Sequence, residues 1–173
     1  MIDLSPFLHR WRESDVWHER MALGCVLRGH YQAIPSRRNP CELYLLRVWL
    51  SAPVPAEDGV GFRSSSSRLL HFIAEPDADG ALHDHPWDFA THILSGGYVE
   101  ELPGFGWDPA SWAGPRLTRR VRHGVGAVIS HNATDLHRIA SVEPDTWTLV
   151  NTGRHVRAWG FHPPGQAWKG FTP

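Results

Sequence analysis

The feature that most limits the fold of this chain is a series of short apolar stretches that begins near residue 41 and is interrupted by turn-forming residues. Two of them, ELYLLRVWLS (residues 42–51) and RLLHFIAE (residues 68–75), are rich in branched and aromatic side chains, and a loop at residues 52–67 separates them. Further stretches follow at residues 82–102, 116–131, 136–142, 146–153 and 156–162. Short strands at regular spacing, with turns between them, are typical of an all-β sandwich or barrel rather than of β-α-β units.

The first 40 residues have a different pattern. Apolar side chains recur there at a helical spacing, and Ser5-Pro6 has the residue types that begin a helix. The apolar positions are Phe7, Leu8, Trp11, Val16, Trp17, Met21, Ala22, Val26 and Leu27. We therefore expect residues 1–40 to form a short N-terminal helical extension and residues 41–173 to form a β-domain, the two together making one folding unit.

Charge and cysteine content exclude several classes of function. Lys plus Arg number 17 and Asp plus Glu 18, so the chain has no net field that attracts nucleic acid or an anionic membrane. We find no apolar run of signal-peptide or membrane-spanning length, so we expect a cytoplasmic protein without nucleic-acid or membrane partners. Cys25 and Cys41 have neither a CxxC nor a zinc-ribbon spacing, so we expect nitrogen and oxygen to hold any metal.

Histidines are concentrated in LHDHPWDFATH at residues 82–92. In an extended strand alternate side chains share a face, so His83 and His85 point the same way, with Cα atoms roughly 6.5–7 Å apart. His137 follows a tight turn and begins another strand-like stretch, which makes it the best candidate for a third ligand. Three imidazoles that meet inside a β-barrel can hold a divalent metal at about 2.0–2.2 Å per bond.

Other polar residues near this segment are placed by strand parity. His92 is odd in parity relative to His85, so we expect it on the opposite face. Asp84 also alternates outward and is expected in a turn or as a group that orients a ligand. His71 is expected either to line the barrel or to be an ordinary hydrogen-bonded histidine.

These residues resemble the first motif of the cupin family. That motif is a glycine, five residues, His-x-His, three or four residues, a glutamate, six residues and a glycine. The sequence has His83 and His85, followed by Gly96-Gly97 at the expected distance, while the leading Gly80 stands closer than the pattern asks.

The second cupin motif is a glycine, five residues, Pro-x-Gly, two residues, a histidine, three residues and an asparagine. Gly126 and His137 fall at matching positions, and Asn132, Thr134 and Ser141 replace the proline, glycine and asparagine. The resemblance covers residues 69–162. The chain also resembles a group of bacterial and phage-type cupins that carry LHDHPW-x-F, GGY-x-E, HR and WGF, which stand here at residues 82–89, 96–100, 137–138 and 159–161.

The resemblance implies a cupin-type jelly-roll β-barrel that holds a divalent metal between the three histidines named above. The glutamate of the family pattern has no counterpart here, because strand parity leads to Trp87 and Phe89. Asp88 is one step out of phase, but the preceding proline can mark a bulge that turns it inward. Two versions of the site stay open: three histidines alone, or three histidines with an oxygen of Asp88.

The expected ligands restrict the metal and the substrate. Nitrogen and oxygen donors with open coordination positions suit Fe(II), Zn(II), Mn(II) and Ni(II), of which we expect Fe(II) first. Trp87 and Tyr98 are expected to line an aromatic-walled pocket for a small-molecule substrate. Arg154 and Arg157 flank the last strands, where an inward arginine can grip a substrate carboxylate, the alternative being a solvated arginine.

The resemblance thus implies a metal-dependent enzyme that acts on a small organic molecule. An Fe(II)-dependent oxygenase, which is a dioxygenase-like oxidoreductase, is the leading interpretation. A metal-dependent isomerase or epimerase and a non-enzymatic small-molecule-binding cupin stay open, because a fold does not fix a function. Cupins often pair through strands, so a homodimer is also compatible with the sequence.

Overall fold

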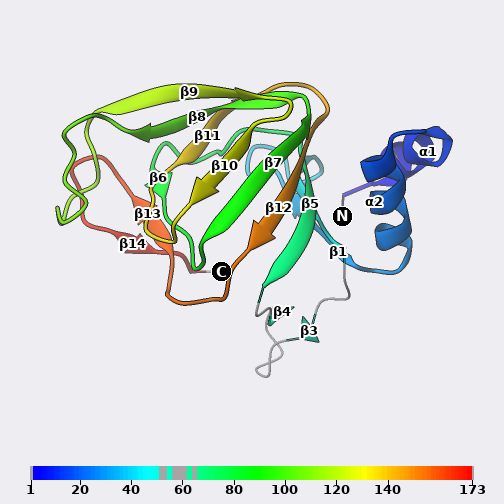
Figure 1. Ribbon diagram of the computed structural model, residues 1–173, viewed down its shortest axis with the longest axis horizontal. Helices are drawn as coiled ribbons and strands as arrows, with labels where there is room; N and C mark the ends of the chain where they lie inside the picture. The colour runs from blue at the N-terminus through cyan, green and yellow to red at the C-terminus, as the bar shows by residue number, and fades with distance from the viewer. Residues whose placement is uncertain (1, 51–53, 56–61, 64–65, 173) are drawn as a thin grey trace.

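The structure, a computed structural model, describes residues 2–50, 54–55, 62–63 and 66–172. Two helices come first in the chain and strands follow, with every strand pair antiparallel (Figure 1). The mostly β architecture with a minor helical extension is therefore as the sequence predicts. Most of the loop expected at residues 52–67 lies outside the described residues, apart from the short pair β3 (Val54–Pro55) and β4 (Phe62–Arg63).

The remaining strands form three sheets. The large sheet has the order β1 (Tyr31–Pro35), β2 (Leu43–Trp49), β5 (Ser67–Ile73), β12 (Thr146–Thr152), β7 (Phe89–Ser95) and β10 (Val128–His131). A second sheet has the order β11 (Arg138–Val142), β8 (Gly97–Pro103) and β9 (Thr118–Gly124). A third, small sheet has the order β14 (Lys169–Gly170), β13 (Gly160–His162) and β6 (Leu82–His83).

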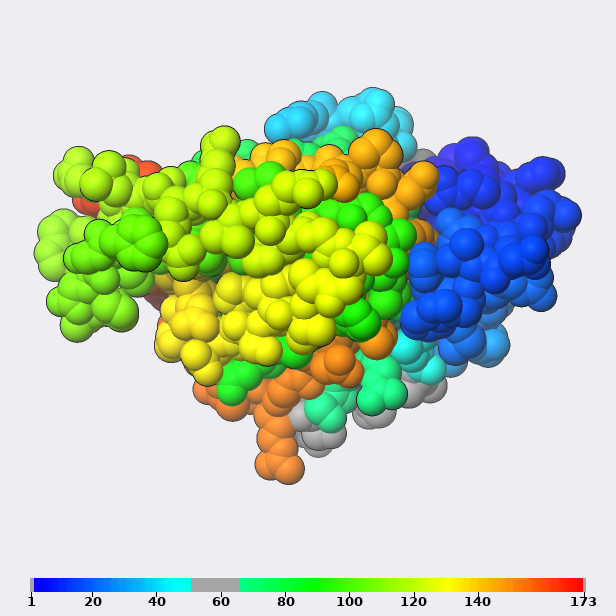
Figure 2. Space-filling view, turned by 45° about the horizontal axis from the view of Figure 1, so that its top comes forward, coloured from blue at the N-terminus to red at the C-terminus, as the bar shows by residue number. Residues whose placement is uncertain are grey.

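The helices cover the outer face of the large sheet. In α1 (Ser5–Glu13) the fully buried Trp11 packs against Trp147 of β12 with ring centres 5.2 Å apart, and Phe72 of β5 completes the contact. Ala22 and Cys25 of α2 (Trp17–Leu27) belong to the same core. Figure 2 shows the helices at one end of the molecule and the connection between β8 and β9 at the other.

A second core lies on the inner face of the large sheet. Along β5, Leu70 and Phe72 belong to the core under the helices, while Ile73 belongs to the inner core with Ile93 and Tyr98. This division follows the two-residue period of a strand. The large sheet is thus layered between the helices and the second sheet, and its inner face is the one that meets the site described below.

Within the described residues the sheets do not join into one closed ladder, so the expected barrel takes the form of a sandwich. The reason is visible where β7 leaves the large sheet and β8 enters the second one. Gly96 makes this corner at φ +64°, and a Cβ there would lie 2.4 Å from Oγ1 of Thr146. A sharp corner of this kind ends one set of strand hydrogen bonds and begins another.

The segment before residue 41 supplies more than helices, because β1 pairs with β2 at the edge of the large sheet. No helix in the described part of the chain is long and apolar enough to span a membrane.

Candidate metal centre

Three histidines from two segments of the chain lie side by side. His83 ends β6, His85 follows two residues later, and His137 directly precedes β11. The main-chain N–H of His83 donates to the carbonyl of His137 over 2.9 Å, and the N–H of His137 returns the bond over 3.1 Å. The N–H of His85 donates to the carbonyl of Ala133 over 3.0 Å. Backbone pairing, rather than side-chain contacts alone, therefore brings the three rings together.

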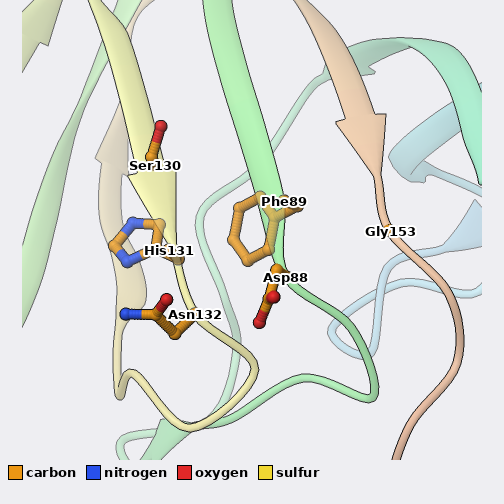
Figure 3. A pocket seen from close by; sticks show the side chains of 6 residues that line it. All are labelled: Asp88, Phe89, Ser130, His131, Asn132 and Gly153. Atoms are coloured by element: carbon orange, nitrogen blue, oxygen red, sulfur yellow. The ribbon is translucent and has the colours of Figure 1, made fainter.

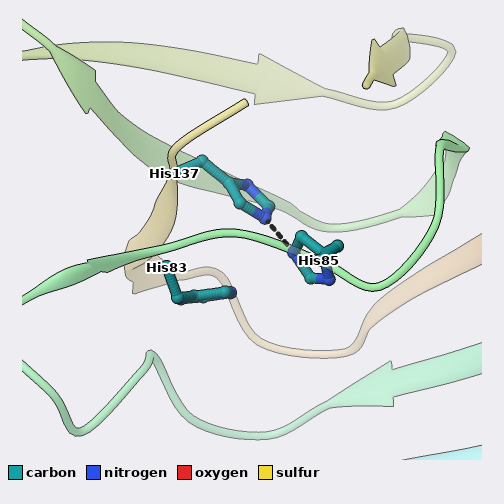
Figure 4. A group of neighbouring side chains, drawn as sticks. All are labelled: His83, His85 and His137. Atoms are coloured by element: carbon teal, nitrogen blue, oxygen red, sulfur yellow. Dashed lines mark hydrogen bonds between the residues drawn. The ribbon is translucent and has the colours of Figure 1, made fainter. Parts of the chain in front are cut away.

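The ring nitrogens of these histidines converge (Figure 4). Their potential ligand atoms all lie within 4.8 Å of one another. The Nε2 atoms of His85 and His137 are 2.7 Å apart, and the ring of His83 has its centre 5.0 Å from each of the other two. Phe89, which belongs to the inner face of β7, lies 4.6 Å from the ring of His85. The structure thus brings together three of the four predicted ligands.

The surroundings of His83 and His85 favour the neutral form of their imidazoles. Burial, followed by the neighbouring His137, lowers the pKa of His83 from 6.5 to about 4. Burial and the same neighbour hold the pKa of His85 well below its ordinary value. Since a metal binds the neutral imidazole and competes with a proton for it, these two side chains are ready to bind at neutral pH.

A buried carboxylate orients the third histidine. Glu100 of β8 is 1% exposed, and its Oε1 lies 2.6 Å from Nδ1 of His137. Nε2 of His123 lies 2.9 Å from the other carboxylate oxygen. Nε2 of His131 lies 2.8 Å from Oε1 but without a hydrogen-bond alignment, so His137 is the better-aligned partner. Glu100 therefore holds His137 by Nδ1 and leaves Nε2 to face His85.

The charge state of Glu100 follows from these contacts. Burial alone would raise the pKa of this carboxyl, but the imidazoles of His131 and His137 outweigh burial and hold the pKa well below its usual range. An ionised Glu100 accepts a hydrogen bond from Nδ1–H of His137. This bond fixes the tautomer in which Nε2 is free to bind a metal. Sequence reasoning missed this residue. The signal was its place two residues after Tyr98, which puts both side chains on one face of β8.

A second set of side chains is also close enough to hold a metal, and it consists of Glu100, His131 and His137. The two sets share His137 and use different nitrogens of its ring. In the first set Glu100 supports a ligand, whereas in the second set it would be a ligand and His137 would lose its orienting partner. We therefore regard the three-histidine set as the better one.

Asp88, the fourth predicted ligand, lies elsewhere. It is exposed, and its Oδ1 accepts the main-chain N–H of Ala133 over 2.7 Å. It lines a pocket of about 350 Å³ (Figure 3) together with Phe89, Ser130, His131, Asn132 and Gly153. Phe89 and His131 also contact two of the candidate ligands, with ring centres 4.6 Å from His85 and 4.5 Å from His137 respectively. The pocket therefore borders the histidine cluster, and Asp88 stands at its wall.

The two arginines predicted to bind a substrate lie in different surroundings. Arg157 donates from Nη1 to Oδ2 of Asp84 over 2.7 Å and to the carbonyl of Ala133 over 3.1 Å. Asp84, which lies between His83 and His85 in the chain, is 1% exposed and also accepts the N–H of Gly160 over 2.6 Å. Arg157 thus neutralises a buried carboxylate that links the connection between β6 and β7, here called the histidine loop, to β13. Arg154 is exposed.

The two predicted aromatic residues lie in different surroundings. Tyr98 is 5% exposed and packs in the inner core, where burial raises the pKa of its hydroxyl. Trp87 is half-buried with its ring centre 6.2 Å from His155. Trp159 instead stacks on His85 at 6.4 Å with an interplanar angle of 7°, and Phe161 lies 6.1 Å from His83. The WGF segment at residues 159–161 therefore lies beside the histidines, a position that the sequence alone does not predict.

Among known proteins, similarity to this chain is found at the level of the fold. No family model and no curated protein matches the sequence. Among solved structures, the DMSP lyase DddQ from Ruegeria pomeroyi DSS-3 is similar with a TM-score of 0.53 and 15% identity, over 92% of this chain and 77% of that chain. At this identity the match shows the fold alone, and it agrees with the jelly-roll type of sandwich that the cupin resemblance implies.

Two further structures are similar at lower scores. KdgF from Halomonas sp. has a TM-score of 0.44 and 16% identity over 72% of this chain and 86% of that chain. Fe(II)-HppE has a TM-score of 0.45 and 12% identity over 72% of this chain. The present chain covers 56% of the length of Fe(II)-HppE, so it spans little more than half of that protein.

Proposed function

We propose that this protein is a metal-dependent cupin enzyme that acts on a small organic molecule and binds a divalent metal through His83, His85 and His137. The observation that carries the proposal is the convergence of three imidazoles within 4.8 Å of one another, beside a pocket of about 350 Å³. Fe(II) is the metal we propose first, and an oxygenase is the reaction class we propose first.

Each group around the proposed site has a defined task. A divalent metal held by three imidazoles supplies a Lewis acid with open coordination positions or a centre for oxidation. Glu100 keeps the proton of His137 on Nδ1, so Nε2 is available as a ligand. Phe89 lies edge-on to the ring of His85 and Trp159 lies parallel to it, so aromatic side chains border this imidazole. The pocket wall at His131 gives a small substrate a place next to the ligands.

Elemental analysis of protein purified without chelator tests the metal. The wild type should retain a divalent metal, and His83→Ala and His137→Ala variants should lose it while they remain folded by circular dichroism. His92→Ala is the matched control, because His92 lies on β7 opposite Leu149, which packs with the outer core under the helices. Retention of the metal by His137→Ala would contradict the proposal.

The reaction class needs a separate measurement. Oxygen consumption by the ferrous protein in the presence of small organic acids and alcohols should depend on His83 if the protein is an oxygenase. Turnover of a sugar-like or keto substrate without oxygen uptake would assign an isomerase or epimerase instead. A filled pocket without bound metal would assign a non-enzymatic binding protein and refute the enzyme proposal.

A further inference from the structure

Arg47 is a cation on the inner face of the large sheet. Its neighbours in β2, Leu46 and Val48, are fully buried in the core beneath the helices. Because alternate side chains of a strand point to opposite faces, Arg47 projects away from the helices. It is half-buried, on the same side of the sheet as Phe89, whose ring contacts the proposed metal ligand His85.

Two polar side chains lie beside Arg47 in adjacent strands. His71 of β5 is the cross-strand partner of Arg47, and Thr148 of β12 is the cross-strand partner of His71. Both are flanked in sequence by residues that pack toward the helices, namely Leu70 and Phe72, and Trp147 and Leu149. Directly opposed side chains on one face of a sheet have Cβ atoms about 4.5–5.5 Å apart. The three polar groups therefore form a row across the inner face.

This row has unused hydrogen-bonding capacity. Within the described residues no carboxylate lies at ion-pair distance from Arg47, whose Nη1 donates to the neutral Oε1 of Gln32 over 3.3 Å. Nε2 of His71 and Oγ1 of Thr148 are buried without a hydrogen-bond partner, and Thr148 is 0% exposed. Buried polar groups in native proteins are nearly always paired, so two adjacent unpaired groups beside a cation without a carboxylate partner indicate a missing ligand.

The charge of Arg47 acts on its neighbour in the row. Burial and the Arg47 guanidinium lower the pKa of His71 to about 3, so His71 is neutral and keeps one N–H donor. The inner face that carries this row also carries Phe89, whose ring centre lies 4.6 Å from that of His85. The row and the proposed metal site therefore share one face of the large sheet.

We propose that Arg47, with His71 and Thr148, binds an anionic oxygen group of the substrate, a carboxylate or a phosphonate, while another part of that substrate lies at the metal. This inference rests on the proposed metal site. The planar fork of arginine presents two parallel donors that match such an oxyanion, and the hydroxyl and imidazole supply further polar partners. The substrate class is thus a small organic anion, and Arg47 takes the role that the sequence suggested for Arg154 and Arg157.

Calorimetric titration of the full-length protein loaded with Zn(II) tests this assignment. The probes are malonate, methylphosphonate and malonamide, which separate a carboxylate, a phosphonate and a neutral analogue. Malonate or methylphosphonate should bind and malonamide should not. Arg47→Gln should weaken binding of the anion at least about tenfold, whereas Arg47→Lys should weaken it less because one charged donor stays.

Two further variants control for folding. Arg68→Gln removes an exposed arginine on the outer face of β5, on the side of Leu70 and Phe72, and should leave anion binding unchanged. Thr148→Val keeps the shape of the side chain and removes a buried hydroxyl that has no hydrogen-bond partner, so it should not destabilise the fold. It should weaken binding of the anion several-fold.

The metal and the anion are measured separately, so the two proposals can fail independently. Wild-type protein that holds Zn(II) but binds neither anion, or that binds malonamide equally well, overturns the anion site and leaves the metal site in place. Equal anion binding by wild type and Arg47→Gln overturns it too. Anion binding that depends on Arg47 in protein that holds no Zn(II) would support the anion site and refute the proposed function.

Discussion

Glu100 shows how one side chain determines what its neighbours can do. It is an almost fully buried carboxylate on β8, and imidazoles of His123, His131 and His137 surround its two oxygens at 2.6–2.9 Å. A buried charge is tolerated when it is paired and hydrogen-bonded. The same contacts fix the ring of a proposed metal ligand, so the stability of the site and its chemistry depend on the same atoms.

Replacing Glu100 by glutamine should lower the affinity for the metal without removing a ligand. The amide oxygen still accepts from His137, but the negative charge that supports the imidazole is lost, so metal affinity should fall about 10–100-fold. Competition with a chromophoric chelator measures the change. Glu101→Gln is the control, because that carboxylate contacts Thr118 and Arg138 instead. An affinity within twofold of the wild type would count against the orienting role.

Acid should destabilise the metal-free protein in a defined range. The pKa of His71 is about 3 and that of His83 about 4 in the folded state, against an ordinary value of 6.5. As the pH falls below 6.5 the unfolded chain takes up protons that the folded chain does not, so the free energy of unfolding decreases. From pH 7 to pH 5 we expect a loss of roughly 1–2 kcal/mol per group.

Urea denaturation at several pH values between 7 and 5 measures this loss. A His71→Leu variant should lose less stability over the same range, because it lacks one of the histidines whose pKa is lowered in the folded state. The acid effect would have another origin if wild type and His71→Leu lost the same amount.

At the scale of elements, the side chain of Asp84 adds to the backbone hydrogen bonds that hold the loop between β6 and β7. Asp84 accepts from the N–H of Gly160 in β13, from Arg157, and from Nε1 of Trp168 over 3.1 Å. These bonds join the histidine loop to the last strands of the chain. The proposed ligands are therefore positioned by a carboxylate that points away from them.

Removal of Arg157 should test this support. Arg157→Ala leaves the buried carboxylate of Asp84 without its charged partner and should lower the free energy of unfolding by about 2–3 kcal/mol. Arg154→Ala removes an exposed arginine three residues earlier and should change it by less than about 0.5 kcal/mol. Chemical denaturation of the three proteins gives both numbers. Equal effects of the two substitutions would show that the ion pair contributes nothing.

Periodicity and turn residues were sufficient to predict the class of the fold and its helical start. The three histidines were found because their spacing in sequence becomes a spacing in space when the backbone is extended. The same parity argument left Asp88 open, and the structure has it on the pocket wall, bonded to Ala133. Glu100, Arg47 and the partner of Arg157 depend on which strands become neighbours, and no local pattern in the sequence contains that information.

For the whole molecule, the two cores give the large sheet different roles on its two faces. The outer face packs apolar side chains against α1 and α2, and the inner face combines an apolar end around Ile93 with the polar row and the histidines. A metal bound by His83, His85 and His137 would hold together segments around residues 83 and 137, which are far apart in the chain. Binding should therefore stabilise the entire fold.

Thermal unfolding with and without metal tests this coupling. At a free metal concentration about 100-fold above the dissociation constant, binding to the folded state adds about 2.7 kcal/mol of stability. For a chain of this size that amounts to a rise in Tm of roughly 5–10 °C. Excess chelator should reverse the rise, and His137→Ala should not show it. A metal-dependent shift of equal size in that variant would place the metal elsewhere.

The position of the two helices has a practical consequence for work with this protein. They cover one face of the large sheet (Figure 1). The imidazoles lie on the other side of that sheet, so an affinity tag or a surface tether joined to the amino end should leave the pocket open. The carboxyl end is a poorer place for such a label. It continues directly from Trp168, whose indole is bonded to the aspartate between the two motif histidines.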